Sequence, residues 1–171
     1  MNSHARASGF QRRIYASPVQ FVRDLWRIAR SIRAVLALSS RAGIAAGFRE
    51  RIMLVVTGVN RCRHCAWGHE ILAHQVGLSK VEIASLLVLD LANCPDSEIP
   101  GLLYAIHWTE SDGTPAAARR TGLEATYGPG AAHQIEAAAL MIHTGNRFGN
   151  TFDYWLSRIT RGRFGLLVSE R

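Results

Sequence analysis

Residues 62–76 read CRHCAWGHEILAHQV, a pattern that predicts one helix. Gly77 follows it, and glycine readily adopts the left-handed conformation that commonly closes a helix. Upstream, the mostly apolar run Ile44–Val59 predicts a second helix, which ends where Gly58 and Asn60 supply turn chemistry. A turn at that point makes the two helices an antiparallel pair.

The rest of the chain also carries helix punctuation, and it lacks the alternation of apolar and polar residues that is typical of strands. Ser17-Pro18 opens a helix whose apolar stripe runs from Val22 to Leu36. Ser79 and Glu82 form a capping box that opens another. Further helices are predicted from Asp96 or Ser97 to Trp108, from Thr114 to Tyr127, and from Ala131 onward with a bend at Gly145 or Gly149. We therefore predict an all-α fold of about six to eight helices.

The composition predicts one compact domain. The chain has 171 residues, of which 48% are hydrophobic and 19% charged, and this balance excludes an intrinsically disordered protein. We assign residues 1–17 to an Arg-rich flexible arm and residues 18–171 to a single all-helical domain. All but one of the 20 basic residues are arginine, and the formal net charge is +7. We expect the charges of the N-terminal arm to be solvated, with a targeting peptide or an electrostatic arm as the alternative. No nucleic-acid recognition motif accompanies the basic residues.

The first helix carries a row of arginines on the face away from its apolar stripe. We expect this arginine face to be solvated. The row comprises Arg23, Arg27, Arg30 and Arg33. An acidic partner or an anionic membrane surface is the alternative.

Targeting and redox signals point to the cytoplasm. The longest uncharged runs fall far short of the roughly 18 to 20 residues that cross a bilayer, so we expect no membrane span. The N-terminus has no apolar segment of the secretory type. Three cysteines cannot all pair within one chain, and Cys94 stands apart as a spare buried or loop thiol.

One group of residues has the spacing for chemistry. Cys62, Cys65 and His69 lie at helical offsets of 0, 3 and 7, within about 60° of one another, so they share one helix face. Unpaired N–H groups at the helix start lower the pKa of a thiol placed there, as Cys62 is. His69 can accept the proton of Cys65. In the antiparallel pair Glu50 reaches the height of His69 and can orient it.

These residues resemble a known family. Glu50, then eleven residues, then Cys-x-His-Cys-x-x-x-His, with the cap Gly-Leu-Ser-x-x-Glu after the helix, resemble the alkylhydroperoxidase AhpD-like branch of the carboxymuconolactone decarboxylase family. The resemblance is strong over residues 44–91 and weaker over 131–160. It implies an all-helical homotrimer or homohexamer whose thiol pair reduces hydroperoxides. An external dithiol, a dihydrolipoyl or thioredoxin-like protein, would recycle the pair.

The resemblance also implies a role for each residue. Cys65 would be the peroxidatic thiol and Cys62 the resolving thiol, with Glu50 and His69 in the proton relay and His64 assisting. The implied mechanism needs no metal and no organic cofactor. Helix physics alone ranks the thiols differently, because it favours Cys62, nearer the helix start, as the lower-pKa group.

Two other functions remain open. Four residues read as a possible zinc set, namely Cys62, Cys65, His69 and His74, which would make the chain a zinc-stabilised basic binding protein. On one helix, however, His74 lies about 140° from His69, which makes closure around one ion poor. The third interpretation is a carboxymuconolactone decarboxylase-like enzyme acting on a small organic acid.

Individual site residues also have purely structural interpretations. Glu50 can form a salt bridge with Arg147 or another arginine. His64 points away from the face of Cys62 and can serve packing or an interface. We interpret three tryptophans as core or subunit contacts: Trp67, Trp108 and Trp155.

Overall fold

The computed structural model describes residues 10–40 and 43–170, and this part of the chain is all helical, with no strand. The all-α prediction is therefore confirmed there. The elements are α1 (Pro18–Arg30), α2 (Ile32–Ala37), α3 (Ala46–Asn60), α4 (Arg63–Gln75), α5 (Lys80–Leu87), α6 (Ile99–Glu110), α7 (Ala117–Ile159) and the 3-10 turn η1 (Val168–Glu170). Among the described helices, none combines enough length with enough apolar character to cross a lipid bilayer.

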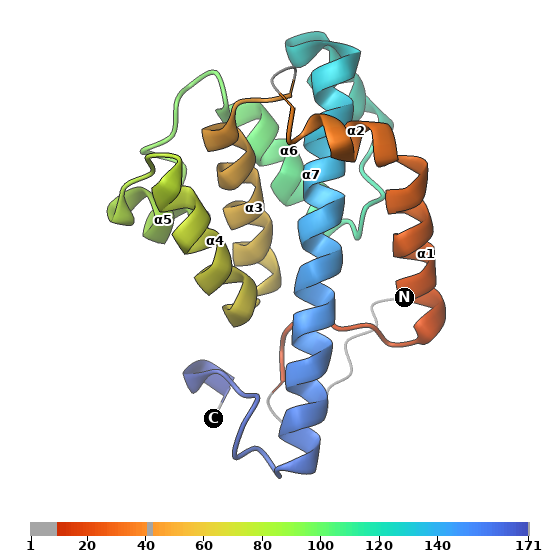
Figure 1. The fold of residues 1–171 in the computed structure, drawn as a ribbon, viewed down its shortest axis with the longest axis vertical. Coiled ribbons are helices and arrows are strands. Elements are labelled where there is room, and N and C mark those ends of the chain that lie inside the picture. Colours follow the sequence, from red (N-terminus) through yellow and green to blue (C-terminus); the bar gives the residue numbers. More distant parts are fainter. Residues whose placement is uncertain (1–9, 41–42, 171) are drawn as a thin grey trace.

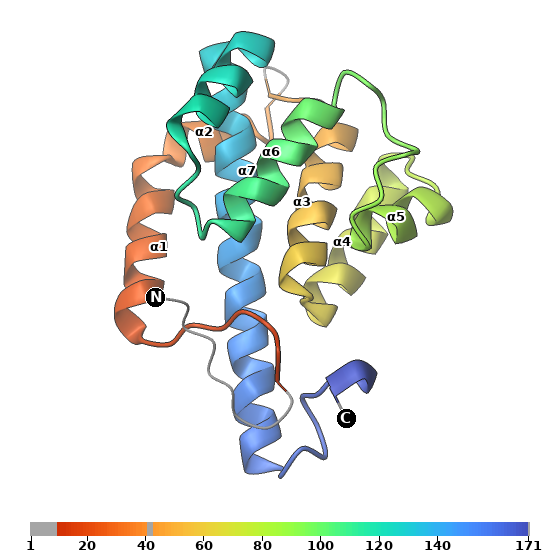
Figure 2. The ribbon, with the colours of Figure 1, turned by 180° about the vertical axis from the view of Figure 1, so that it is seen from behind.

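Helix α7 runs the length of the molecule, with α1 and α2 on one side and α3, α4 and α5 on the other (Figure 1). From behind, α6 covers α3 and α7 (Figure 2). Helix α3 is central, since it contacts α4, α5, α6 and α7. Its side chains Ile52, Leu54 and Val55 are fully buried and form the middle of the core.

The α3–α4 pair forms as predicted, but its turn lies one residue later. Gly58 and Asn60 are both inside α3, and the chain turns at Arg61, which adopts a left-handed φ of 55°. Gly58 instead allows α5 to approach the backbone of α3 closely. A Cβ atom there would lie 2.6 Å from the Leu87 carbonyl oxygen, so glycine lets the end of α5 pack on α3.

The cap predictions hold at both ends of the α4–α5 connection and in α7. Gly77 has a φ of 93°, and the Ser79 hydroxyl accepts a hydrogen bond from the Glu82 amide at 3.2 Å. Gly128, with φ 76° and ψ 160°, breaks the helix at the predicted point before Pro129. The expected bend at Gly145 or Gly149 is absent, because Gly128 is the only residue inside α7 with non-helical backbone angles.

Helix α1 turns its apolar stripe outward. Val22 and Trp26 are 61% and 64% exposed, whereas Asp24 is buried. The Asp24 carboxylate lies 3.6 Å from the Arg147 guanidinium, so a buried ion pair selects this orientation. The expectation of a fully solvated arginine face was wrong for Arg27, which donates a hydrogen bond to the Gly113 carbonyl at 2.7 Å.

Part of the expected N-terminal arm packs on the helical domain. Residues 1–9 lie outside the described part of the chain. Phe10 and Arg12 are buried. The charge of Arg12 is therefore not solvated, contrary to the expectation. The segment is tied to α7, since the Tyr15 amide donates to the Thr151 hydroxyl and the Asn150 side chain donates to the Arg13 carbonyl.

Candidate functional site

The predicted cysteine pair lies at the start of α4. Cys62 is the N-cap and Cys65 is in the first turn, and their sulfurs form a disulfide with the Cα atoms 5.4 Å apart. The Cys65 amide donates a hydrogen bond of 3.4 Å to the Cys62 sulfur. Cys62 is only 1% exposed, whereas Cys65 is partly exposed. The two sulfurs therefore differ in both access and hydrogen bonding.

Glu50 and His69 meet across the α3–α4 pair, as the sequence predicted. His69 Nδ1 lies 2.8 Å from Glu50 Oε2. Because an ionised carboxylate only accepts hydrogen bonds, Nδ1 carries the proton, and Nε2 of a neutral imidazole is left as a proton acceptor. Glu50 is buried and His69 is largely covered, so the hydrogen bond between them is mostly shielded from solvent.

A neighbouring arginine compensates the buried charge of Glu50. Arg49 Nε lies 3.3 Å from Glu50 Oε1, and the same guanidinium donates to the Leu38 carbonyl. Arg147, the partner considered in the structural interpretation, does not pair with Glu50. It lies 3.0 Å from Asp112 and 3.6 Å from Asp24.

Helix α7 packs against the cysteine pair at Gly149. A Cβ atom at this position would lie 3.1 Å from the Cys62 sulfur and 3.9 Å from both the Cys65 sulfur and His64 Cδ2. Glycine therefore lets the helix backbone approach the cysteine pair closely. His64 flanks the same contact and is half-exposed, with its Nε2 3.0 Å from Asp153 Oδ1.

Asp153 is a buried anchor that the sequence reasoning missed. Its carboxylate pairs with Arg12 at 2.6 Å, with Arg63 at 2.7 Å and with His64. Burial alone would raise its pKa, but the hydrogen bonds from Arg12, His64 and Arg63 outweigh burial, and the pKa is lowered. Gly149 and Asp153 are four residues apart on one helix face, and that spacing was the available signal.

A second buried polar cluster lies beside the end of α3. Asn60 donates to His143 Nδ1 at 3.1 Å, and His143 Nε2 donates to Asp112 at 3.2 Å. The hydrogen bond from His143, together with Arg147, lowers the pKa of Asp112 to about 2. Burial lowers the pKa of His143. Of these residues only Arg147 was assigned a partner from the sequence, and that partner was Glu50.

His74, the fourth residue of the possible zinc set, and the remaining cysteine, Cys94, lie apart from the Cys62–Cys65 pair. His74 Nδ1 donates to the Leu78 carbonyl at 3.0 Å, at the far end of α4. In residues 10–40 and 43–170, no three His, Cys, Asp or Glu side chains are placed to hold a metal ion. Cys94 is a free, buried thiol, as expected, and burial raises its pKa.

No family model, curated protein or solved structure matches this chain.

Proposed function

We propose that this protein is a thiol-dependent hydroperoxide reductase that cycles between a Cys62–Cys65 dithiol and its disulfide. The observation that supports it is the cysteine pair at a helix start, next to a buried Glu50–His69 hydrogen bond. A vicinal thiol pair supplies two electrons, and a carboxylate-oriented imidazole supplies a base. Reduction of ROOH to ROH and water consumes those two electrons.

The reaction proceeds in two chemical steps. His69 Nε2 takes the proton of the Cys65 thiol, and the thiolate attacks the distal oxygen of ROOH, so that the O–O bond breaks. Cys65 becomes a sulfenic acid, and the alkoxide takes a proton to leave as ROH. The Cys62 thiol then attacks the sulfenic sulfur, which forms the disulfide and releases water.

Access favours Cys65 as the sulfur that meets both reactants. It is partly exposed, whereas Cys62 is buried beneath Gly149. An external dithiol would attack the Cys65 sulfur and expel Cys62 as a thiolate. The hydrogen bond from the Cys65 amide to the Cys62 sulfur stabilises that leaving group. A second thiolate of the donor then releases Cys65 and completes the reduction.

The proposed cycle needs a reductant and a reducing compartment, and it gives His64 a positioning role. A dihydrolipoyl or thioredoxin-like protein is the proposed reductant, and the cytoplasm is the proposed location, since the cycle needs reducing power. His64, held by Asp153 beside Gly149, is proposed to assist by positioning the helix start that carries the pair.

We further propose that the protein is a homo-oligomer, a trimer or hexamer, assembled through the exposed apolar stripe of α7. The stripe consists of Phe148, Phe152, Trp155 and Ile159, which are 59% to 78% exposed. Its spacing of three and four residues places the four on one helix face. Trp155→Glu with Ile159→Glu should shift the mass in light scattering toward the monomer, whereas Arg158→Glu should not.

Thiol titration tests the redox function directly. Reduced wild-type protein, treated with one equivalent of cumene hydroperoxide, should rapidly lose two of its three titratable thiols. Cys62→Ser should lose one thiol and form a dimedone adduct at Cys65. Cys65→Ser should lose none, and Cys94→Ser should behave like wild type. A wild-type protein that keeps all three thiols would exclude the function.

Retention of peroxide turnover by Cys65→Ser would instead move the attacking role to Cys62. The same set of proteins therefore separates the general proposal from the assignment of the two sulfurs.

A further inference from the structure

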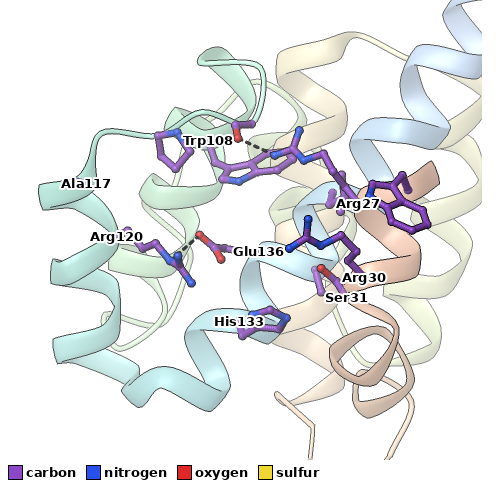
Figure 3. A pocket seen from close by; sticks show the side chains of 13 residues that line it. Arg27, Arg30, Ser31, Trp108, Ala117, Arg120, His133 and Glu136 are labelled. Atoms are coloured by element: carbon purple, nitrogen blue, oxygen red, sulfur yellow. Dashed lines mark hydrogen bonds and ion pairs between the residues drawn. The ribbon is translucent and has the colours of Figure 1, made fainter. Parts of the chain in front are cut away.

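A cleft with a cavity volume of about 500 Å³ lies between α1, α6 and α7, away from the cysteines (Figure 3). Volumes of this size suit small organic ligands. The lining residue on α7 nearest to Gly149 in sequence is Leu140, nine residues before it, or roughly 14 Å along the helix. The cleft is thus separate from the proposed redox site and needs its own explanation.

Positive charge dominates the cleft. Three guanidinium groups line it, those of Arg27, Arg30 and Arg120, against the single carboxylate of Glu136. Glu136 is already engaged, since it accepts from the Tyr104 hydroxyl and lies 3.4 Å from Arg120. Arg27 lies 3.8 Å from Asp24 and Arg120 lies 3.5 Å from Glu124. Among the described residues, the charge in the cleft that has no carboxylate paired with it is therefore that of Arg30.

Arg30 is the guanidinium available to a ligand. Within the described part of the chain it makes no hydrogen bond or ion pair, whereas Arg27 is held by Gly113 and Arg120 by Glu124 and Glu136. Figure 3 shows Arg30 reaching from α1 across the cleft toward Glu136 of α7. His133, also on α7, lines the same cleft with no described partner. A planar, unpaired guanidinium at a concave site matches a carboxylate in bidentate geometry.

The remaining walls are apolar and partly aromatic. Trp108 is buried behind Arg27, whose guanidinium carbon lies over its ring 5.4 Å from the ring centre. Leu140 and Ala137 add aliphatic surface from α7, and the exposed indole of Trp26 stands at the rim. A strongly hydrated inorganic anion gains nothing from such walls, but a ligand with a flat apolar body buries its surface against them.

We propose that this cleft binds a small carboxylate carried on a flat apolar body, of the arylcarboxylate class. Arg30 pairs with the carboxylate, and the apolar body packs against the exposed indole of Trp26 beside Leu140. The site does not involve the thiols, so it is a ligand site distinct from the proposed peroxide reduction.

The test is calorimetric titration of the full-length protein with 2-naphthoate, 2-naphthalenemethanol and inorganic phosphate. The naphthoate should bind saturably with a Kd below about 1 mM, and the neutral alcohol and phosphate should each bind at least about tenfold more weakly. Arg30→Gln should weaken naphthoate binding about tenfold or more. Arg23→Gln is the matched control, because it removes an unpaired arginine of the same helix outside the cleft, and it should bind like wild type.

Circular dichroism should show that both variants are folded, since neither arginine has a structural partner among the described residues. Cys65→Ser should bind naphthoate like wild type, which keeps this result independent of the redox function. Equal affinity of Arg30→Gln and wild type would overturn the proposal. Phosphate binding as tightly as naphthoate would also overturn it, because the cleft would then be a simple anion site.

Discussion

His69 on α4 and Glu50 on α3 are joined by a hydrogen bond of 2.8 Å between Nδ1 and Oε2. The bond crosses from one helix to the other, so it forms only when the two helices are packed. It leaves Nε2 of a neutral His69 as the acceptor. In the proposed reaction, the carboxylate also stabilises the imidazolium that forms when the thiol loses its proton.

Glu50→Gln should therefore slow the proposed peroxide reduction. The amide oxygen can still accept from His69 Nδ1, but it carries no charge to stabilise the imidazolium. Because positioned acid–base groups contribute about 10²–10⁴-fold, we expect kcat/KM to fall by about 10² or more. Glu70→Gln, at an exposed position on α4, is the control. Equal alkylation rates of the Cys65 thiol in Glu50→Gln and wild type at pH 7 would contradict the relay.

Gly149→Ala should crowd the cysteine pair. Alanine favours a helix over glycine by about 1 kcal/mol, but the new methyl group would lie 3.1 Å from the Cys62 sulfur. Gly145 lies on the same helix, and a Cβ atom there would meet nothing within 4 Å, so Gly145→Ala should stabilise by about 0.5–1 kcal/mol. Urea unfolding of the oxidised proteins should place Gly149→Ala about 1–3 kcal/mol below Gly145→Ala. Equal stability would mean that α7 does not press on the sulfurs.

Asp153→Asn should destabilise the fold strongly. The change removes one of the two buried carboxylates that pair with Arg12 and leaves Glu170 at 3.1 Å as the other, and breaking a buried ion pair costs up to about 3–5 kcal/mol. It also frees Arg63 and His64 beside the cysteine pair. Chemical denaturation of Asp153→Asn and of the exposed control Asp96→Asn provides the comparison. A loss below about 1 kcal/mol would show that the ion pairs are replaceable by water.

Stability should fall as the pH drops from neutral toward 3. His143 has a pKa lowered from 6.5 by burial, so the folded state favours its neutral form and loses stability as the pH falls below 6.5. Asp112 has a pKa of about 2, below its ordinary 3.8, so its contribution is complete above pH 4 and is lost as the pH falls toward 2. Both groups act in the same direction.

The measurement is the midpoint of urea-induced unfolding, compared between wild type and Asp112→Asn from pH 7 to pH 3. The variant should start lower at pH 7 and lose less stability between pH 4 and pH 3, because the titrating carboxyl group is gone. Parallel curves for the two proteins in that interval would assign the acid sensitivity to other groups.

The features that could be predicted from the residues alone depend on short-range chemistry. Helix class, the left-handed cap at Gly77, the capping box at Ser79 and the break at Gly128 all arise from interactions within one or two turns. The register of Cys62, Cys65 and His69 follows from the helical repeat. The meeting of Glu50 with His69 was also predictable, since one short turn joins their helices.

Packing between helices that are distant in the sequence determined which residues contact the predicted helices. Gly149 approaches the Cys62 sulfur, and Asp153 gathers Arg12 from about 140 positions away in the chain. No local pattern encodes such pairings, because they depend on which helix faces pack together. Helix α1 illustrates the cause. Its apolar stripe points outward because the buried ion pair of Asp24 with Arg147 fixes the opposite face inward, and an unpaired buried charge costs more than an exposed apolar side chain.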